Sequence, residues 1–350
     1  MRRASPPATP TVSVTIVTWN SGRHIGRCLE AVLAQTVRPT EVVVVDNAST
    51  DGTLEAVEAF GNRVRLIRNR VNAGFAAAQN QAIVSTRSDW VLTLNPDTLL
   101  KPGFVQALLE AAGADSCIGT VCGKLLSIRP DFSLFEEPRL DSTGIYFTPA
   151  LRHLDRGWRE PDNDNRYVQP EFVFGACAAA ALFRRELIED ISLEDGFFDP
   201  DFFAYREDAD VAWRAQLAGW RCLYTPAAEA YHVRRVTPDN RRSVPAFINM
   251  HSVKNRFLMR VKNITAPLYW RNFGAILARD LLVIGGCLLR EPSSLPAFWH
   301  FLRALPRALD KRRQVMARRR VSDDYIASWF SGQPAAQRAP EVASAVSTAA

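Results

Sequence analysis

The segment from Glu41 to Thr53, EVVVVDNASTDGT, joins four consecutive valines to a polar run that ends at Asp51-Gly52-Thr53. A short run of β-branched residues is what a strand buried on both faces requires. The sequence Thr50-Asp51-Gly52 is suited to cap a short helix, which we expect to end near Phe60. The segment therefore predicts a strand, a turn and a helix, which together are the repeating unit of a parallel α/β sheet.

The sequence on either side of this unit continues the same alternation. We predict strands at 12–18, 64–67, 90–94 and within 171–183, and helices at 25–33, 75–84, 102–109 and 207–218. Strands that alternate with helices at this spacing predict βαβ units and a mainly parallel α/β sheet. The sequence has no GxGxxG pattern, which argues against a dinucleotide-binding fold. The polar, proline-bearing stretch 127–169 is predicted to be an irregular active-site loop or insertion.

The chain of 350 residues is long enough for one large domain with an appendage. We assign residues 1–263 to an α/β catalytic domain and residues 264–330 to basic, amphipathic, membrane-proximal helices. Residues 331–350 are rich in Ala, Ser and Pro, a composition typical of disorder.

The composition indicates a cytoplasmic protein. Its six cysteines have no CxxC spacing, which fits a reducing compartment. No apolar run follows Arg2 and Arg3 before the first predicted strand, so we expect no signal peptide. The longest apolar stretch, 281–289, is shorter than the roughly 20 residues that span a bilayer.

Two polar clusters follow predicted strands, at the edge where open parallel sheets bind ligands. The first is 46–52, in which the Asp46 carboxylate can accept the imide N–H of a uracil or thymine ring while its neighbours meet the ribose. The second is Asn95-Pro96-Asp97, where a carboxylate can hold a divalent cation against a diphosphate. Taken alone, the first cluster is better explained as a capped strand–helix turn, and the second also forms an ordinary turn.

A third cluster, Glu207-Asp208-Ala209-Asp210, begins a predicted helix. Acidic residues in a first turn usually complement the helix dipole, and the same field keeps a carboxylate ionised and able to accept a proton. His232 follows the strand-like segment 221–224 and precedes Arg234-Arg235. This setting suits a site for a metal and phosphates, although a lone histidine is more often structural.

Jointly, these clusters resemble the family 2 glycosyltransferases of the GT-A fold. The motifs occur in the family's order over about 12–233, as VSVTIVTWNS, VVVVDNASTDGT, NRVNAGFAAAQNQA, LTLNPDT, FGACAAAALFRRE, GFFDPDFFAYREDADVAWRAQLAGW and YTPAAEAYHV. The NPD and FFAYREDADVAWR motifs are most similar to bacterial rhamnosyltransferases of cell-envelope polysaccharide synthesis. The resemblance implies a Rossmann-like, mainly parallel sheet with flanking helices, followed by C-terminal amphipathic helices.

The resemblance also implies roles for the matching residues. Asp208 would be the catalytic base, and Asp97 and His232 would bind Mg²⁺ or Mn²⁺. The donor nucleotide would meet Thr18, Asn20, Asp46, Asn47, Asn72, Gly74 and Asn95. Acceptor binding, or support of the base, would fall to Gly175, Ala176, Glu207 and Asp210. The family's usual metal motif has aspartate at both ends, so Asn95 leaves the site with one negative charge fewer.

The implied activity is a metal-dependent, inverting transfer of L-rhamnose from dTDP-L-rhamnose. The acceptor would be a hydroxyl of a cell-envelope glycan or of a polyprenyl-diphosphate-linked sugar. Within the family, the alternative is a galactofuranosyl or hexosyl donor. Outside the enzyme class, it is a non-catalytic scaffold that binds nucleotide sugars. No nucleic-acid partner is expected, because the basic C-terminal region lacks interleaved exposed aromatic residues and any recognisable motif.

The C-terminal region also predicts a membrane partner. Apolar residues at 281–289 and 298–302 accompany two basic triplets, 311–313 and 318–320. Because each basic residue near an anionic leaflet contributes roughly 1 kcal/mol, we expect peripheral binding to the inner face of the cytoplasmic membrane. The alternative for 281–289 is packing on the catalytic domain.

Overall fold

A computed structural model describes residues 10–163, 166–234, 245–330 and 337–338. Its main sheet has the strand order β13-β10-β12-β6-β11-β4-β1-β2-β3, with β5 and β7 attached to β12 and β6, while β8 and β9 pair separately. The strands are β1 (Val12–Thr18), β2 (Glu41–Asp46), β3 (Arg65–Arg68), β4 (Trp90–Leu94), β5 (Thr98–Leu100), β6 (Ile118–Ser127), β7 (Leu140–Ser142), β8 (Ile145–Phe147), β9 (His153–Asp155), β10 (Glu171–Val173), β11 (Ala180–Arg184), β12 (Arg221–His232) and β13 (Gln337–Arg338).

The parallel part of the sheet brings the predicted strand ends to one edge. β1 pairs in parallel with both β2 and β4, and β2 pairs in parallel with β3. β11 lies antiparallel between β4 and β6, and β12 runs parallel to β6. The valines at 42–45 are buried, as a strand covered on both faces requires. The predicted α/β class with a mainly parallel sheet is therefore confirmed.

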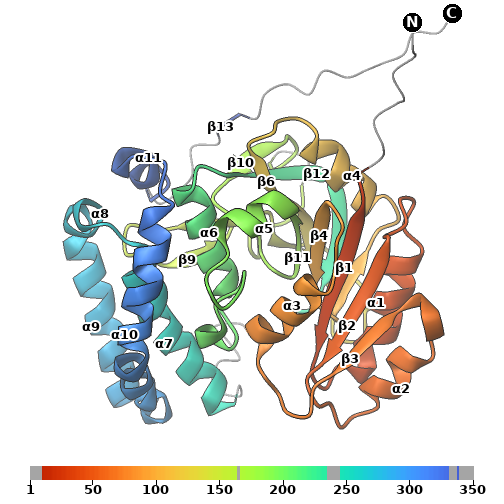
Figure 1. Cartoon of the computed structure of the whole chain (residues 1–350), viewed down its shortest axis with the longest axis horizontal. Coiled ribbons are helices and arrows are strands. Elements are labelled where there is room, and N and C mark those ends of the chain that lie inside the picture. Colours follow the sequence, from red (N-terminus) through yellow and green to blue (C-terminus); the bar gives the residue numbers. More distant parts are fainter. Residues whose placement is uncertain (1–9, 164–165, 235–244, 331–336, 339–350) are drawn as a thin grey trace, which may run out of the picture.

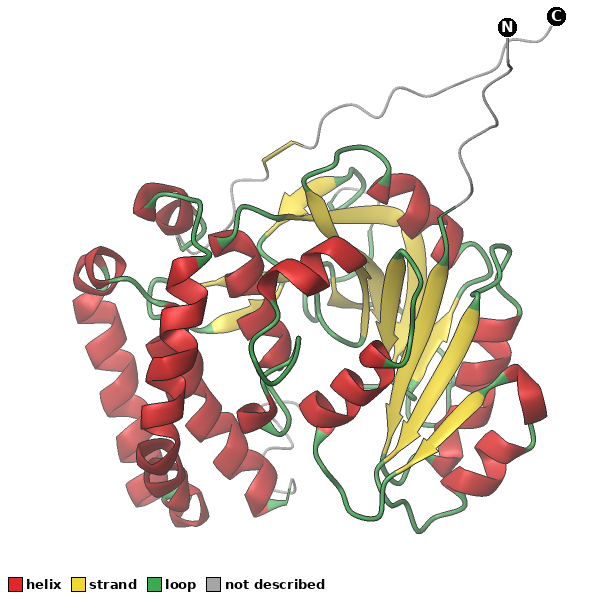
Figure 2. Ribbon diagram, in the orientation of Figure 1, coloured by secondary structure: helices red, strands yellow, loops and turns green. Residues whose placement is uncertain are grey.

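Helices cover the sheet in two groups (Figures 1 and 2). α1 and α2 lie beside β1, β2 and β3, while α7, α9 and α10 form a layer on the other side of the molecule. The helices are α1 (Gly22–Leu33), α2 (Thr53–Glu58), α3 (Phe75–Val84), α4 (Phe104–Ala112), α5 (Arg185–Ile191), α6 (Glu207–Leu217), α7 (Ala246–Asn263), α8 (Ala266–Arg271), α9 (Phe273–Leu289), α10 (Pro296–Ala317) and α11 (Asp323–Ser328).

The stretch 127–169 is more regular than its composition suggests. It contains β7, which pairs with the end of β6, and the β8–β9 hairpin. β7 is fully buried and includes Asp141. A strand of only three residues leaves no alternating pattern to read in the sequence, which explains why the prediction of an irregular loop was wrong here.

The C-terminal helices share the main hydrophobic core with the sheet. Trp329 and Phe330, just after α11, are buried in the same cluster as β-strand residues. The Phe330 ring lies 5.4 Å from Phe147 and 5.2 Å from Trp213, measured between centroids. Of the predicted disordered tail 331–350, residues 337–338 form β13, which pairs with β10. The rest of that tail lies outside the described residues.

A buried ion network joins α10 to the loop that precedes α6. The carboxylates of Asp195, Asp199 and Asp201 lie close enough together to hold one cation. The ammonium group of Lys311, which is buried, contacts all three of them. Lys262 of α7 also pairs with Asp199. Lysine nitrogens therefore already compensate this acidic cluster.

Several cations of the two basic triplets contact other parts of the protein, whereas the Arg313 side chain is exposed, so the membrane role of the triplets stays a prediction. Besides Lys311, Arg312 donates to the Val261 carbonyl. In the second triplet, Arg318 donates to the Ser192 carbonyl, and Arg320 forms two hydrogen bonds with Asp190. These cations thus satisfy carboxylate and carbonyl acceptors in α7, in α5 and just after α5.

The apolar face of α9 remains uncovered in the described structure. Its exposed large side chains include Leu282, which is 68% exposed, and Leu289, which is 85% exposed. Trp270 of α8 adds a further exposed aromatic ring. None of the helices within the described ranges is both long and apolar enough to cross a membrane.

Candidate active site

A cleft of about 1280 Å³ opens where β1, β2 and β4 end and extends to α7 and α9. It contains most of the residues selected from the sequence. Those that line it are Asn47, Asn72, Gly74, Asn95, Asp97, Glu207, Asp208 and His232. Thr18, Asn20, Asp46, Gly175, Ala176 and Asp210 do not line it.

Asp46 lies beneath the cleft surface and organises the turn after β2. Its carboxylate accepts hydrogen bonds from the Thr18 hydroxyl at 2.9 Å and from the Ser49 amide at 3.0 Å, and also from the Ser49 hydroxyl. Asn20 accepts a hydrogen bond from the Thr50 amide at 2.9 Å. These contacts match the capped-turn interpretation of the cluster, and they leave Asn47 as the member that reaches the cleft.

Gly74 permits a close contact that shapes the cleft. Its φ of +85° is a conformation that other residues rarely adopt, and a Cβ atom there would lie 2.6 Å from the Phe203 ring. The Asn72 side chain accepts a hydrogen bond from the Gly74 amide at 2.9 Å, and Asn47 donates to the Gly74 carbonyl at 3.2 Å. The predicted NAGF turn is thus joined to the β2 turn on one side and to Phe203 on the other.

Asp97 and His232 face each other at the centre of the cleft. Asp97 follows β4, His232 ends β12, and Oδ1 of the first lies 3.6 Å from Nε2 of the second. Two ligands of one cation at about 2.1 Å each would lie roughly 3 to 3.6 Å apart for bond angles near 90–120°. Asn95 is also close, with Nδ2 lying 3.4 Å from His232 Nε2.

Asp141 completes this group and was not predicted from the sequence. It is fully buried, and its Oδ2 lies 2.8 Å from His232 Nδ1. A carboxylate on the far nitrogen of a histidine is the usual support of a metal-binding imidazole. The oxygen and nitrogen donors of Asp97 and His232, with this support, therefore fit a divalent cation. The short buried strand β7 gave no sequence signal that could have identified Asp141.

The carboxylates around His232 also determine its charge. Burial alone would lower its pKa, but Asp141 and Asp97 raise the pKa of His232 to about 9. Arg234 lies on the other side of Asp141, with Nε 2.6 Å from Oδ1, and also pairs with Asp155 at 2.7 Å. Without a bound metal, the imidazolium of His232 and the guanidinium of Arg234 together balance the buried charge of Asp141.

Asp208 is held at the start of α6 by a backbone segment in unusual conformations. Phe203, Tyr205 and Arg206 all have φ between +65° and +71°. The side-chain amide of Asn255, from α7, lies 2.8 Å from each of the carbonyl oxygens of residues 202, 204 and 205. Residues in sparsely populated conformations persist only when their surroundings fix them, and they cluster at functional sites.

The environment of Asp208 suits a group that accepts a proton near neutral pH. Burial and the nearby charge of Asp155 raise its pKa to about 6, although the amides of Ala209 and Ala178 partly oppose this. The corresponding donor–acceptor distances are 2.7 Å and 3.4 Å. A catalytic base works best when its pKa lies near the operating pH.

The two acidic neighbours of Asp208 differ in their surroundings. Burial and the charge of Asp208 raise the pKa of Glu207 well above its usual value. Asp210 is fully buried, paired with Arg214 at 3.0 Å and Lys262 at 2.9 Å. Asp210 is therefore committed to the interior, where it links α6 to α7.

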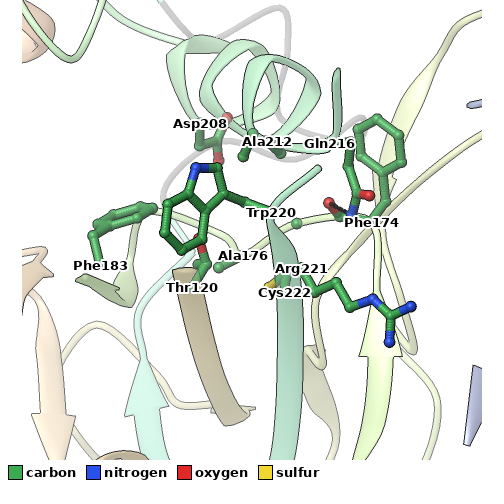
Figure 3. A pocket seen from close by; sticks show the side chains of 12 residues that line it. Thr120, Phe174, Ala176, Phe183, Asp208, Ala212, Gln216, Trp220, Arg221 and Cys222 are labelled. Atoms are coloured by element: carbon green, nitrogen blue, oxygen red, sulfur yellow. Dashed lines mark hydrogen bonds between the residues drawn. The ribbon is translucent and has the colours of Figure 1, made fainter. Parts of the chain in front are cut away.

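Gly175 and Ala176 lie behind Asp208. They line a small cavity of about 10 Å³ with Ala212 and Trp220, and Figure 3 shows Asp208 and Ala212 on the helix above this space. A Cβ atom at Gly175 would lie 2.2 Å from the Ala212 Cβ atom. The absence of a side chain at 175 thus allows α6 to approach the sheet, while a role of Gly175 and Ala176 in supporting the base stays a prediction.

The fold, with acidic side chains gathered at one cleft beside the ends of its parallel strands, is that of the GT-A glycosyltransferases. Among solved structures, it is similar to GalNAc-T7 with UDP, GalNAc and Mn²⁺, with a TM-score of 0.58 and 16% identity over 73% of this chain and 48% of that one. It is also similar to S. aureus TarS residues 1–349, with a TM-score of 0.52 and 18% identity over 88% of both chains.

The sequence comparison identifies the family. Residues 13–192 match the description Glycosyl transferase family 2, and the chain belongs to this family. A relative from Mycobacterium tuberculosis, N-acetylglucosaminyl-diphospho-decaprenol L-rhamnosyltransferase, is 28% identical over 81% of this chain and 96% of its own length. The succinoglycan biosynthesis protein ExoO of Rhizobium meliloti is 30% identical over 66% of this chain and 64% of its own length. The protein is therefore a family 2 glycosyltransferase.

Proposed function

We propose that the protein transfers L-rhamnose from dTDP-L-rhamnose to a hydroxyl of a polyprenyl-diphosphate-linked sugar, with inversion at the anomeric carbon. The observation that carries this proposal is the meeting of Asp97, His232 and Asp208 in one cleft. The mycobacterial relative, whose name includes both rhamnose and a lipid diphosphate, supports the choice of donor and acceptor.

The chemistry follows from the surroundings of each side chain. Asp208 accepts the proton of the acceptor hydroxyl, whose oxygen attacks the anomeric carbon from the face opposite the leaving diphosphate. A single displacement of this kind inverts the anomeric configuration. Asp97 and His232 would hold Mg²⁺ or Mn²⁺, which when bound compensates the negative charge of the diphosphate. Asn47 and Asn72 lie on the side of the cleft proposed for the nucleoside.

A panel of donors tests this function. Purified protein is given dTDP-L-rhamnose or UDP-hexoses with a polyprenyl-diphosphate-linked sugar, and release of nucleotide diphosphate and the product's anomeric configuration are measured. We expect turnover with dTDP-L-rhamnose that stops in chelator and returns with Mg²⁺ or Mn²⁺. Turnover with UDP-hexoses alone would reject the rhamnosyl assignment, and binding without turnover would favour the non-catalytic scaffold.

We also propose that α9 rests on the membrane that carries the acceptor. Its exposed apolar residues are continuous with the cleft, because Leu282, Val283 and Gly286 line the cleft from the same helix. A leucine fully transferred from water contributes about 1.5–3 kcal/mol, so several such residues suffice for reversible binding. The lipid surface is the occupant that fits a lipid-linked acceptor.

A vesicle-sedimentation experiment tests the membrane proposal. The variant Leu281→Asp/Leu289→Asp should lose binding to phosphatidylglycerol vesicles, since it places two charges on the exposed face of α9. Val84→Asp is the matched control, because Val84 is 71% exposed on α3, away from the C-terminal helices. Equal sedimentation of both variants would contradict a membrane role for α9.

A further inference from the structure

Six arginine side chains line the cleft, among them Arg234 beside Asp141 and Arg290 just after α9. The other four come from four different segments and are linked by electrostatic effects on one another or on His153, and they are Arg152, Arg206, Arg256 and Arg279. Arg152 precedes β9, Arg206 precedes α6, Arg256 lies in α7 and Arg279 lies in α9. A group of cations assembled from four separate segments is a feature of the tertiary fold, not of one charged helix.

Arg256 is the most informative member of this group. It is only 5% exposed, and within the described ranges it has no hydrogen bond or ion pair. Burial and the charge of Arg279 lower its pKa to about 10, although Asp280 opposes this. Asp280 itself pairs with Arg260 at 2.7 Å. A buried guanidinium without a carboxylate partner is unfavourable unless an anion binds to it.

Arg206 is already oriented toward the same region. Its Nε donates to the Ser252 carbonyl at 2.9 Å, and its NH1 lies 2.8 Å from His153 Nδ1. Burial, and then the charges of Arg206, Arg256 and Arg152, hold the pKa of His153 well below its usual value. The neutral imidazole therefore accepts a hydrogen bond from Arg206, and the other arginines are close enough to influence it.

The acidic groups near these arginines are already engaged. Asp155 pairs with Arg234 at 2.7 Å, and Glu291 has a partner of its own. Planar guanidinium groups bind phosphate oxygens through pairs of parallel hydrogen bonds, which makes a phosphate-bearing ligand the natural anion for such a cluster. Two adjoining phosphates would use more of the cluster than one.

The cluster lies between the base and the apolar helix. Arg206 is two residues before Asp208, while Arg279 is on α9 beside Leu282. A Cβ atom at Gly286 would meet nothing within 4 Å, so the α9 side of the cleft is open. From Asp208 outward, the cleft thus offers a base, a cationic cluster and an apolar surface. A polyprenyl-diphosphate-linked sugar has its matching parts in the same order, which are the sugar, the diphosphate and the hydrocarbon chain.

We propose that Arg152, Arg206, Arg256 and Arg279 bind the diphosphate of a polyprenyl-diphosphate-linked acceptor, separately from the donor diphosphate near Asp97. This inference rests on the proposed function for the type of acceptor. The sugar of the acceptor then extends to Asp208, and its hydrocarbon lies along α9.

Binding measurements with the full chain test this inference. The probes are farnesyl diphosphate, inorganic diphosphate, farnesol and dTDP, each titrated by calorimetry into wild type and Arg256→Gln. We expect Arg256→Gln to weaken the affinity for farnesyl diphosphate by about 10- to 100-fold, because charge-assisted hydrogen bonds are lost. Its affinity for dTDP should stay within about two-fold. Arg303→Gln, which removes an exposed charge from α10, should change neither.

Several outcomes of these titrations would contradict the proposed diphosphate site. Equal affinity of wild type and Arg256→Gln for farnesyl diphosphate overturns the proposal. If Arg256→Gln loses as much affinity for dTDP as for farnesyl diphosphate, the proposal is also overturned, and the cluster is assigned to the donor. Inorganic diphosphate bound as tightly as farnesyl diphosphate would identify a free-phosphate site instead. Urea unfolding of Arg256→Gln checks the fold, and Arg152→Gln provides a second variant. Because no donor sugar is used, a wrong rhamnosyl assignment would not affect these results.

Discussion

Replacing Asp208 by asparagine removes the proposed base and keeps the shape of the side chain. General-base catalysis contributes about 10²–10⁴-fold in rate, so the variant should lose at least about 100-fold in kcat. This corresponds to about 3–5 kcal/mol in the activation barrier. Donor affinity should change little, because Asp97, Asn47 and Asn72 lie elsewhere in the cleft.

The pKa of about 6 for Asp208 gives this prediction a second readout. A base must be ionised to act, and ionisation is lost as pH falls through the pKa. About nine-tenths of the molecules are ionised at pH 7 and about one-tenth at pH 5, so kcat/KM should fall roughly ten-fold between them. The assay is nucleotide diphosphate release at saturating and limiting acceptor, from pH 5 to 8.

Glu207→Gln distinguishes the two neighbouring carboxyl groups. Because burial and the charge of Asp208 raise the pKa of Glu207 well above its usual value, neutral glutamine is a conservative replacement, and the loss of activity below about pH 6 should persist in this variant. In Asp208→Asn, the residual activity should not show this fall as pH decreases. Near-normal turnover of Asp208→Asn, or an activity of Glu207→Gln that no longer falls below about pH 6, would refute the assignment of the base.

Three further variants test the support of the site. Asp141→Asn should weaken Mn²⁺ binding about 10- to 100-fold, because His232 loses its orienting carboxylate, and unchanged affinity in a Mn²⁺ titration would contradict this. Lys311→Met should lower the free energy of unfolding in urea by about 3 kcal/mol, whereas the exposed Arg313→Met should change it by less than about 0.5 kcal/mol. Asn255→Ala should reduce kcat about ten-fold or more with donor affinity kept, since strained residues lose their support; a change in donor affinity alone would argue against this positioning role.

The strands and helices of the first hundred residues could be predicted because each carries a repeated local pattern. β1, β4 and α3 have the predicted bounds, and β3 is shifted by one residue. The pattern of Val42 to Val45 is sufficient because a strand buried on both faces needs only apolar side chains. The approach of Asp97 to His232 could also be expected, since the family resemblance implies that both bind one metal ion.

The contacts between distant segments could not be predicted in the same way. The sequence shows that residues 311–313 are basic, but only the fold shows that Lys311 meets carboxylates more than a hundred residues earlier. A cation on a helix has the same local pattern whether it faces water, lipid or a buried aspartate. Asp141 and Asn255 were missed for this reason, because their function depends on partners brought close by tertiary packing.

The Lys311 contact also has a consequence for synthesis on the ribosome. Lys311 is separated from Asp199 by 112 residues, so at about 5–20 residues per second it is translated some 6 to 22 s after its partner. Until then, the nascent chain holds three neighbouring aspartates with only part of their counter-charge. We therefore expect prematurely terminated chains to be degraded by the cell's proteases, even when every residue of the proposed catalytic group has been made.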